Sequence, residues 1–182
     1  NVGLHRRMYD GPGVQAAPWL VLHYRGLLVH IGRLQYLRAR ARWSAAGAPF
    51  AAGDPVLDLH IPPTGPLTPA AVDASLAESR AVFGRVFPAD DSRWGVCSSW
   101  LLDPQLAEVL PADSNIVRFQ RRFHLDDDWS RPGGIVEFVF RRVGTAVADL
   151  PPPATTLERA IVDHLASGGQ WHTRRGWCEV PG

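Results

Sequence analysis

The sequence predicts a mixed α/β fold, in which helices pack against one sheet within a single domain over residues 1–182. Of the 182 residues, 46% are hydrophobic, which is enough for a core without disulfides or metals. Short β-rich segments alternate with segments that carry helix start signals, and a strand after a helix usually returns parallel to the strand before it. In chain order, we expect helix 16–25, strands 27–31, 34–41 and 56–61, helix 69–87, strand 93–102, short helix 103–110, strands 115–125 and 134–143, helix 155–168 and strand 170–180.

The N-terminal segment is expected to contain one short helix. Residues 1–17 are polar and turn-rich at their start, so we predict an irregular lead-in. Because residue 1 is Asn rather than Met, we interpret the chain as the C-terminal part of a longer protein. Pro18 fits the first position of helix 16–25, where a missing N–H is not needed.

The next segment is typical of a β-hairpin. Two β-rich stretches, 27–31 and 34–41, flank the pair Gly32-Arg33, which suits a two-residue turn. Near the end of the second stretch, arginines alternate with alanines, so one face of that strand is expected to be solvated or to meet acidic groups.

The centre of the chain contains the clearest strand and helix. Strand 56–61 is a short apolar run that ends at Pro62-Pro63. Thr68 fits an N-cap, and Pro69 fits the first helical position. A helical face then runs through Val72, Leu76, Val82, Phe83 and Val86. We predict that strands 56–61 and 94–102 lie parallel and side by side, with helix 69–87 crossing between them.

The C-terminal half is expected to add three strands and two helices. Asp103-Pro104 fits the start of a short helix. Strands 115–125 and 134–143 each place alternate apolar residues on one face, and the polar loop between them predicts an antiparallel pair. Thr155 and Glu158 have the spacing of a capping box before the last helix.

Composition excludes several classes of function. The net charge is only +1, so the basic surplus of a nucleic-acid binder is absent. No apolar run approaches the roughly 20 residues of a membrane span, and we therefore expect no membrane partner. All 19 basic residues are arginine, which excludes a lysine Schiff base and a P-loop lysine.

The cysteines and histidines suggest neither a disulfide framework nor a metal site. Two isolated cysteines favour a reducing compartment, and we predict a cytoplasmic protein. The seven histidines are dispersed without metal-ligand spacing, so no metal is expected. Abundant Ala, Arg, Gly and Pro without Lys suggest a GC-rich, bacterial genome.

Three segments carry a family resemblance. "VLDLHIPPTGPLTPAAVDASLAESRAVF", "SSWLLDPQLAEVLPADSNIVRFQRRF" and "TTLERAIVDHLASGGQWHTRRGW" resemble the GNAT-like C-terminal domain of bacterial acyltransferase-domain proteins, over about residues 18–178. The resemblance implies a mixed, mostly antiparallel sheet with helices on both faces and a splayed parallel strand pair. It also implies acyl-CoA as co-substrate and a further N-terminal domain in the same protein.

The same resemblance places the pantetheine and pyrophosphate of acyl-CoA on the segment from Leu59 to Thr68. Independently of the family, a helix N-terminus presents unpaired N–H groups and partial positive charge that favour phosphate. The prolines of this segment have no N–H, unlike the residues of the usual glycine-rich pyrophosphate loop. The expected binding residues are Leu59, Ile61, Thr64, Gly65, Leu67 and Thr68.

Transfer to an amine requires a base for the amine and an acid for the leaving thiolate. His60, at the end of the binding strand, is the best-placed base, because neutral imidazole accepts a proton near pH 7. Enzymes of the GNAT type often use a tyrosine as the acid, but all three tyrosines of this chain precede the relevant region. Cys97, Ser98 and Ser99 on the next strand are the nearest substitutes.

Two hypotheses follow for function. The first is an N-acyltransferase that transfers an acyl group from acyl-CoA, or from an acyl carrier, to a small-molecule amine. The alternative is a GNAT-shaped module without catalysis that serves as a binding or interaction domain of a larger protein. The proline-interrupted loop and the missing tyrosine separate the two.

Overall fold

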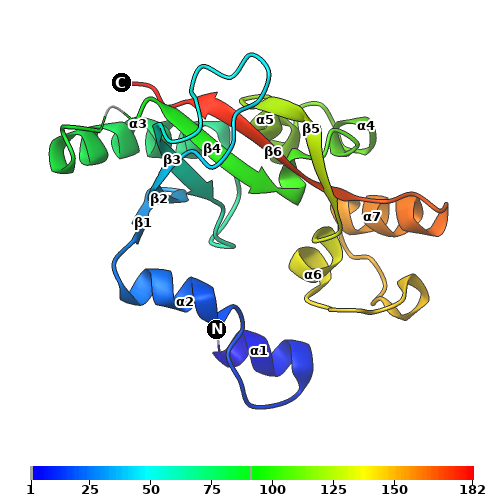
Figure 1. The fold of residues 1–182 in the computed structure, drawn as a ribbon. Coiled ribbons are helices and arrows are strands. Elements are labelled where there is room, and N and C mark those ends of the chain that lie inside the picture. Colours follow the sequence, from blue (N-terminus) through cyan, green and yellow to red (C-terminus); the bar gives the residue numbers. More distant parts are fainter. Residues whose placement is uncertain (1, 91) are drawn as a thin grey trace.

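The computed structural model describes residues 2–90 and 92–182, and its centre is one mixed sheet of six strands (Figure 1). The strand order is β1-β2-β3-β4-β6-β5, and every neighbouring pair is antiparallel except β3 and β4. This confirms the predicted mixed, mostly antiparallel sheet. The strands are β1 (Leu28–Ile31), β2 (Leu34–Arg40), β3 (Pro55–His60), β4 (Trp94–Ser99), β5 (His124–Pro132) and β6 (His172–Glu179).

The hairpin β1–β2 forms as predicted. Gly32 has a φ of 55°, a conformation that favours glycine, and a Cβ there would lie 3.2 Å from the Cβ of Ser75 on the long helix. At the far end of β2, Arg38 and Arg40 both pair with Asp90. The arginine-rich end of this strand therefore meets an acidic group, as expected.

Strands β3 and β4 are parallel, and α3 (Pro69–Val86) crosses between them, which confirms the central prediction from the sequence. Only Leu57↔Gly95 and Asp58↔Val96 are paired, so the two strands separate beyond Asp58. Strands β3 and β4 are therefore the splayed parallel strands that the family resemblance implied.

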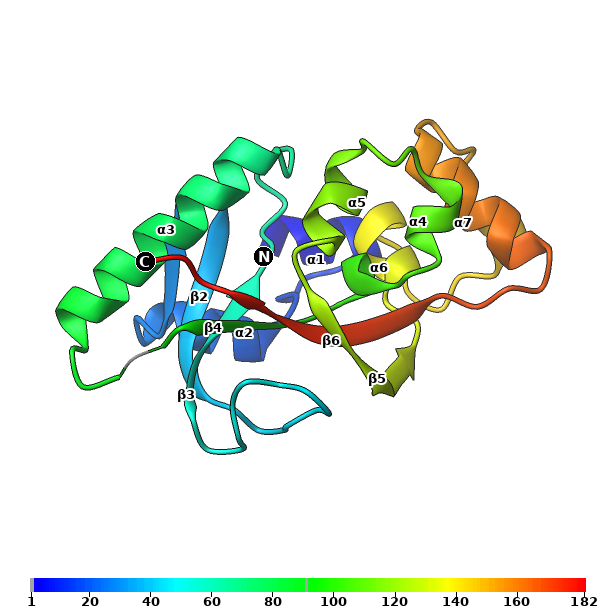
Figure 2. The same cartoon turned by 90° about the horizontal axis from the view of Figure 1, so that it is seen from above.

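Most helices cover one side of the sheet, while the loop 41–54 covers the other (Figure 2), so the helices that the resemblance implied on both faces lie mainly on one. One core cluster joins the sheet to α3 and to Phe119, and a second lies among the C-terminal helices around Trp171. A third packs Phe50 of the loop against Val56 and Trp177. The remaining helices are α1 (Val2–Tyr9), α2 (Ala17–Tyr24), η1 (Trp100–Leu102), α4 (Leu106–Val109), α5 (Asn115–Gln120), α6 (Ile135–Phe140), η2 (Val147–Asp149) and α7 (Thr156–Ala166).

The predicted strand 115–125 is wrong, because its first part is helix α5. The Ser114 hydroxyl accepts the Val117 N–H and caps this helix. Val117 packs into the C-terminal cluster, while Phe119 packs into the cluster beside α3. Because α5 lies between two cores, it buries Val117 on one side and Phe119, two positions later, on the other. Its apolar residues therefore alternate in sequence, as they do in a strand.

The predicted strand 134–143 is also wrong, because it contains helix α6. Gly134, with a φ of 98°, precedes the helix, and Arg141, with a φ of 57°, ends it. Ile135 and Val139, four positions apart, pack against the same cluster. The expected antiparallel pair of strands 115–125 and 134–143 therefore does not exist.

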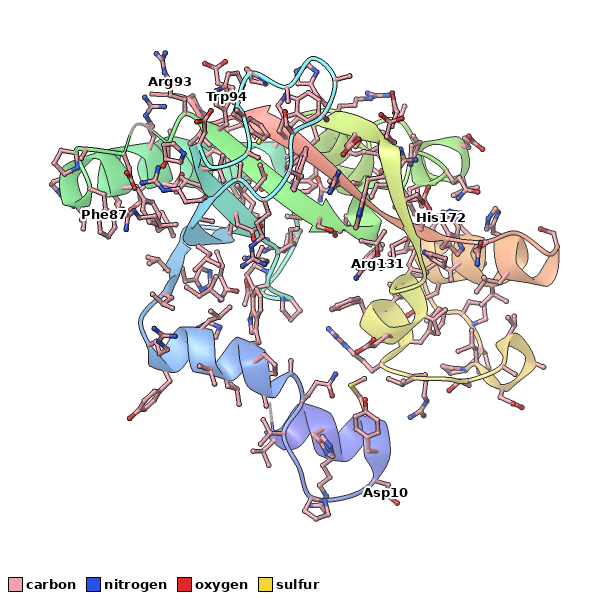
Figure 3. The ribbon with its side chains drawn as sticks, viewed as in Figure 1. Asp10, Phe87, Arg93, Trp94, Arg131 and His172 are labelled. Carbon is pink, nitrogen blue, oxygen red and sulfur yellow. The ribbon has the colours of Figure 1, made fainter. Side chains whose placement is uncertain are left out.

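The acidic segment expected to be a loop is strand β5, which pairs with β6 at the edge of the sheet. Figure 3 shows Arg131 and His172 near each other at one end of this pair. Asp126 is buried against Arg175, whereas Asp127 is solvated. Charged residues are typical of edge strands, which must not pair with other chains.

The structure confirms the predictions for the two ends of the chain only in part. The lead-in 1–17 is not wholly irregular, because Val2–Tyr9 forms α1, whereas helix 16–25 is confirmed as α2. The capping box of Thr155 and Glu158 is present. Among the described residues, no helix is long and apolar enough to cross a membrane.

Candidate functional site

A cavity of about 1080 Å³ opens where β3 and β4 separate. The ends of both strands and the loop between β3 and α3 form one side of it, and α2, α6 and the start of α7 contribute the other. Apolar side chains from several helices line it, namely Leu101, Leu110, Ile116, Phe138 and Leu157. A largely apolar cavity with a few polar groups is typical of a small-molecule site.

Arg33, in the hairpin turn, holds the loop between β3 and α3. Its guanidinium donates to the carbonyl oxygens of Pro62 at 2.9 Å, Pro66 at 3.1 Å and Gly65 at 2.6 Å. The three carbonyl oxygens of the loop therefore all point toward the Arg33 guanidinium. Since Arg33 is occupied by the loop itself, its role is to shape the loop.

The loop amides differ in their availability. The Thr64 N–H donates to the Pro62 carbonyl at 2.9 Å, so this predicted donor is already used. No hydrogen bond from the N–H group of Gly65, Leu67 or Thr68 is found within the described part of the chain. Pro69 begins α3, and the Thr68 side chain makes no capping hydrogen bond. The site thus retains three loop amides next to the first turn of an 18-residue helix.

The structure brings most of the predicted binding residues to the cavity. Leu59, Ile61, Gly65 and Leu67 line it, and His60 lies among them. Thr64 and Thr68 belong to the same loop but do not line the cavity. The strand and the loop therefore both line the cavity, while the binding role of these residues stays a prediction.

His60 is half-buried and has an unusual environment. Its Nε2 is buried without a hydrogen-bond partner among the described residues, and lies 3.6 Å from Oδ2 of Asp58. The Trp19 ring packs edge-on against the imidazole, with 4.4 Å between centroids. Burial lowers the pKa of His60 to about 4, so the imidazole is neutral near pH 7 and its free lone pair is a weaker base than that of a solvated histidine.

The three candidate proton donors on β4 separate in space. Ser98 is exposed and Ser99 half-buried, and both line the cavity. The Ser99 hydroxyl accepts the Leu101 N–H at 3.1 Å, which leaves its own O–H free to donate. Cys97 is buried in the core cluster beside α3, and burial raises the pKa of its thiol well above the usual value. Cys97 therefore does not line the cavity, unlike the two serines that follow it on β4.

Tyrosine does not replace these donors. Tyr36 is fully buried, its hydroxyl lies 2.8 Å from the Ser75 Oγ, and burial raises its pKa to about 12. Tyr9 and Tyr24 are exposed and do not line the cavity.

Three residues of the site were not identified from the sequence. Arg33 was interpreted only as a turn residue, and Trp19 only as part of a short helix. Asp58 lies two positions before His60, and that spacing on a strand was the available signal that the two side chains share a face. No group of three or more potential metal ligands occurs within residues 2–90 and 92–182.

Comparison with known proteins identifies the family. Residues 28–178 match the family described as GNAT-like C-terminal domain. The chain belongs to this family. No curated protein matches the chain.

Solved structures of acyltransferases are similar to this GNAT-like domain over nearly its whole length. An acyltransferase in complex with decanoyl-CoA and teicoplanin is 41% identical, with a TM-score of 0.85, and the match covers 99% of this chain and 55% of that one. An acyltransferase in complex with decanoyl-CoA is 43% identical, with a TM-score of 0.87 and coverage of 99% and 54%. The chain thus spans about 55% of the length of these solved proteins.

Proposed function

We propose that this GNAT-like domain binds acyl-CoA in the cavity between β3 and β4 and takes part in transferring its acyl group to an amine. The separation of the two strands is the observation that carries the proposal. Beyond Asp58, the β4-facing main-chain groups of β3 have no strand to pair with. A pantetheine arm carries amide groups, and these complement such an edge of the strand.

The loop after β3 supports the position of the pyrophosphate. The free amides of Gly65, Leu67 and Thr68 lie at the start of α3, where the helix dipole favours negative charge. In this arrangement Arg33 keeps the loop carbonyls away from the phosphates, because it binds three of them itself.

The apolar part of the cavity supports an acyl chain of medium length. The whole cavity, at about 1080 Å³, is slightly larger than the roughly 300–1,000 Å³ common for small-molecule sites, which leaves room for an acyl chain beside the rest of the ligand. Similar acyltransferases have been solved with decanoyl-CoA and with octanoyl-CoA. We therefore propose acyl groups of about eight to ten carbons as donors, and an amine-bearing small molecule as acceptor.

The proposed chemistry uses His60 as base. The amine nitrogen attacks the thioester carbonyl carbon, its proton passes to His60, and the C–S bond breaks with the electron pair on sulfur. Ser98 or Ser99 is the proposed proton source for the thiolate, since both line the cavity. Cys97 is left out of this proposal because it is buried in the core.

Binding and turnover are tested separately. Calorimetric titration of the intact protein with CoA, acetyl-CoA, octanoyl-CoA and decanoyl-CoA should show binding that strengthens with chain length, because each buried methylene contributes about 0.8 kcal/mol. Mass spectrometry should detect an acylated amine after incubation with an amine acceptor. Failure to bind any of the four ligands would contradict the proposal.

The alternative of a binding module rests on one observation, that among the described residues none of Tyr9, Tyr24 and Tyr36 lines the cavity. Such a module binds acyl-CoA in the same cavity without producing an acylated amine. Tight binding without turnover over a panel of amines supports this second function.

A further inference from the structure

Asp58 and His60 form a pair of titratable groups in which only His60 lines the cavity. The two residues lie two positions apart on β3, so their side chains share one face of the sheet. Leu57 and Leu59 occupy the opposite face, where both are buried in the core beside α3. Asp58 is also the last residue of β3 that is paired with β4, so it lies where the strands begin to separate.

The imidazole of His60 is confined on two sides. The Trp19 ring packs edge-on against it, and the Asp58 carboxylate lies 3.6 Å from Nε2. The two side chains are only 24% and 35% exposed for His60 and Asp58, respectively. Among the described residues, Nε2 has no hydrogen-bond partner, and the Asp58 carboxylate 3.6 Å away is an acceptor toward which this nitrogen can donate.

We propose that Asp58 is a positioning residue for His60, whose carboxylate orients the imidazole with its Nε2–H toward Oδ2 and stabilises the imidazolium formed during acyl transfer. This inference rests on the proposed function. It leaves the Nδ1 lone pair to take the proton of the attacking amine. The products are an amide and a free thiol: the thiolate takes its proton from Ser98 or Ser99, His60 releases the amine proton from Nδ1 to solvent, and the serine is reprotonated from solvent.

The charges around Asp58 determine how the pair responds to pH. Burial raises the pKa of Asp58 to about 6, and Arg42, in the segment after β2, lowers it again in part. His60 lies on the same strand, and on β4 the Cys97 thiol stays neutral because burial raises its pKa. As the pH falls, Asp58 is therefore protonated first, near pH 6. Below that pH its side chain is neutral and no longer orients the His60 imidazole as a carboxylate.

Asp58→Asn tests this role because it retains the shape of the side chain and removes its charge. In the intact protein, with decanoyl-CoA and an amine acceptor, kcat should fall about 10- to 100-fold, while the Kd of CoA changes less than twofold. The acidic limb of the pH profile of kcat/KM should move from about pH 6 to about pH 4, the pKa of His60. Asp90→Asn removes a carboxylate that pairs with Arg38 and Arg40 outside the cavity, and it should leave both kcat and the acidic limb unchanged.

A second measurement does not depend on activity. In protein labelled with ¹⁵N-histidine, and assigned with His60→Gln, nuclear magnetic resonance at pH 7.5 should show the Nε2–H tautomer of His60. An Nδ1–H tautomer would overturn the inference even if Asp58→Asn failed to fold. Wild-type kcat and an unmoved acidic limb in a folded Asp58→Asn variant would also overturn it, while the proposed function would stand. A wild-type protein that binds no acyl-CoA would instead overturn both.

Discussion

Replacing Arg33 should weaken CoA binding without unfolding the protein. In Arg33→Ala, the carbonyls of Pro62, Gly65 and Pro66 lose their common donor. Only the bond to Pro62 is partly shielded from solvent, so we count that bond alone. A hydrogen bond to a charged group contributes about 1.5–3 kcal/mol. The free energy of unfolding should fall by about that amount, which a thermal melt will detect as a shift of several degrees.

The effect on binding follows from the population of the competent loop. Because binding requires the ordered loop, losing about 1.5–3 kcal/mol from its ordered state raises the apparent Kd of CoA by at most about 10- to 150-fold. Calorimetric titration with CoA measures this directly. Arg33→Lys keeps the charge but lacks the planar fork that reaches three acceptors, so it should recover less than half of the lost binding free energy. Wild-type affinity in Arg33→Ala would refute the role of the loop, and wild-type affinity in Arg33→Lys would show that charge alone suffices.

Three further variants test the rest of the site. His60→Ala should lower kcat by about 10²- to 10⁴-fold with little change in the Kd of CoA, and a rate near that of the wild type would move the base elsewhere. Ser98→Ala should reduce kcat. Cys97→Ala should leave kcat unchanged and lower the free energy of unfolding, measured in urea, by about 1 kcal/mol. A lower kcat in Cys97→Ala, with wild-type kcat in Ser98→Ala, would make Cys97 the proton donor. Gly95→Ala should destabilise the fold by about 1–3 kcal/mol, because the added Cβ would lie 2.6 Å from Leu59 Cδ1; a melt identical to that of the wild type would show that the strand pair relaxes freely.

Elements with local signals were predictable from the sequence. Gly32-Arg33 indicates a hairpin through its turn geometry, Pro69 a helix start, and Thr155 with Glu158 a capping box. Each signal depends on the backbone conformation of a few consecutive residues. The parallel return of β4 then follows from the handedness of a strand–helix–strand unit rather than from any single residue.

Elements whose character depends on distant partners were not predictable. Helix α5 alternates apolar residues because Val117 and Phe119 face two different cores, a pattern identical in sequence to a strand. Strand β5 contains three consecutive aspartates, which are rare in strands. It is a strand because β6 has an unpaired edge beside it, and because Arg175 neutralises the buried Asp126.

The residues of the candidate site also differ in whether the sequence alone could identify them. Leu59 was predicted from the family resemblance, and His60 and Ser98 from their places on the two neighbouring strands; all three line the cavity, and their roles stay predictions. The difference between Ser98 and Cys97 required the structure, since alternation places neighbours on opposite faces but does not indicate which face is solvated. Arg33 was missed because its three acceptors lie about 30 residues away in the chain.

On the proposed function, the energetics of β3 fit proton transfer at His60 better than binding alone. A module that only holds acyl-CoA needs the strand edge and the loop amides, and an apolar residue at position 60 would meet that need without a polar penalty. Instead, His60 keeps a buried Nε2 with no partner in the described chain, and burial shifts the pKa values of both Asp58 and His60 toward their neutral forms. Burying a polar group without a hydrogen bond costs about 1–3 kcal/mol. Such destabilising arrangements concentrate where a proton must be moved, and this one lies at the point where the two strands separate.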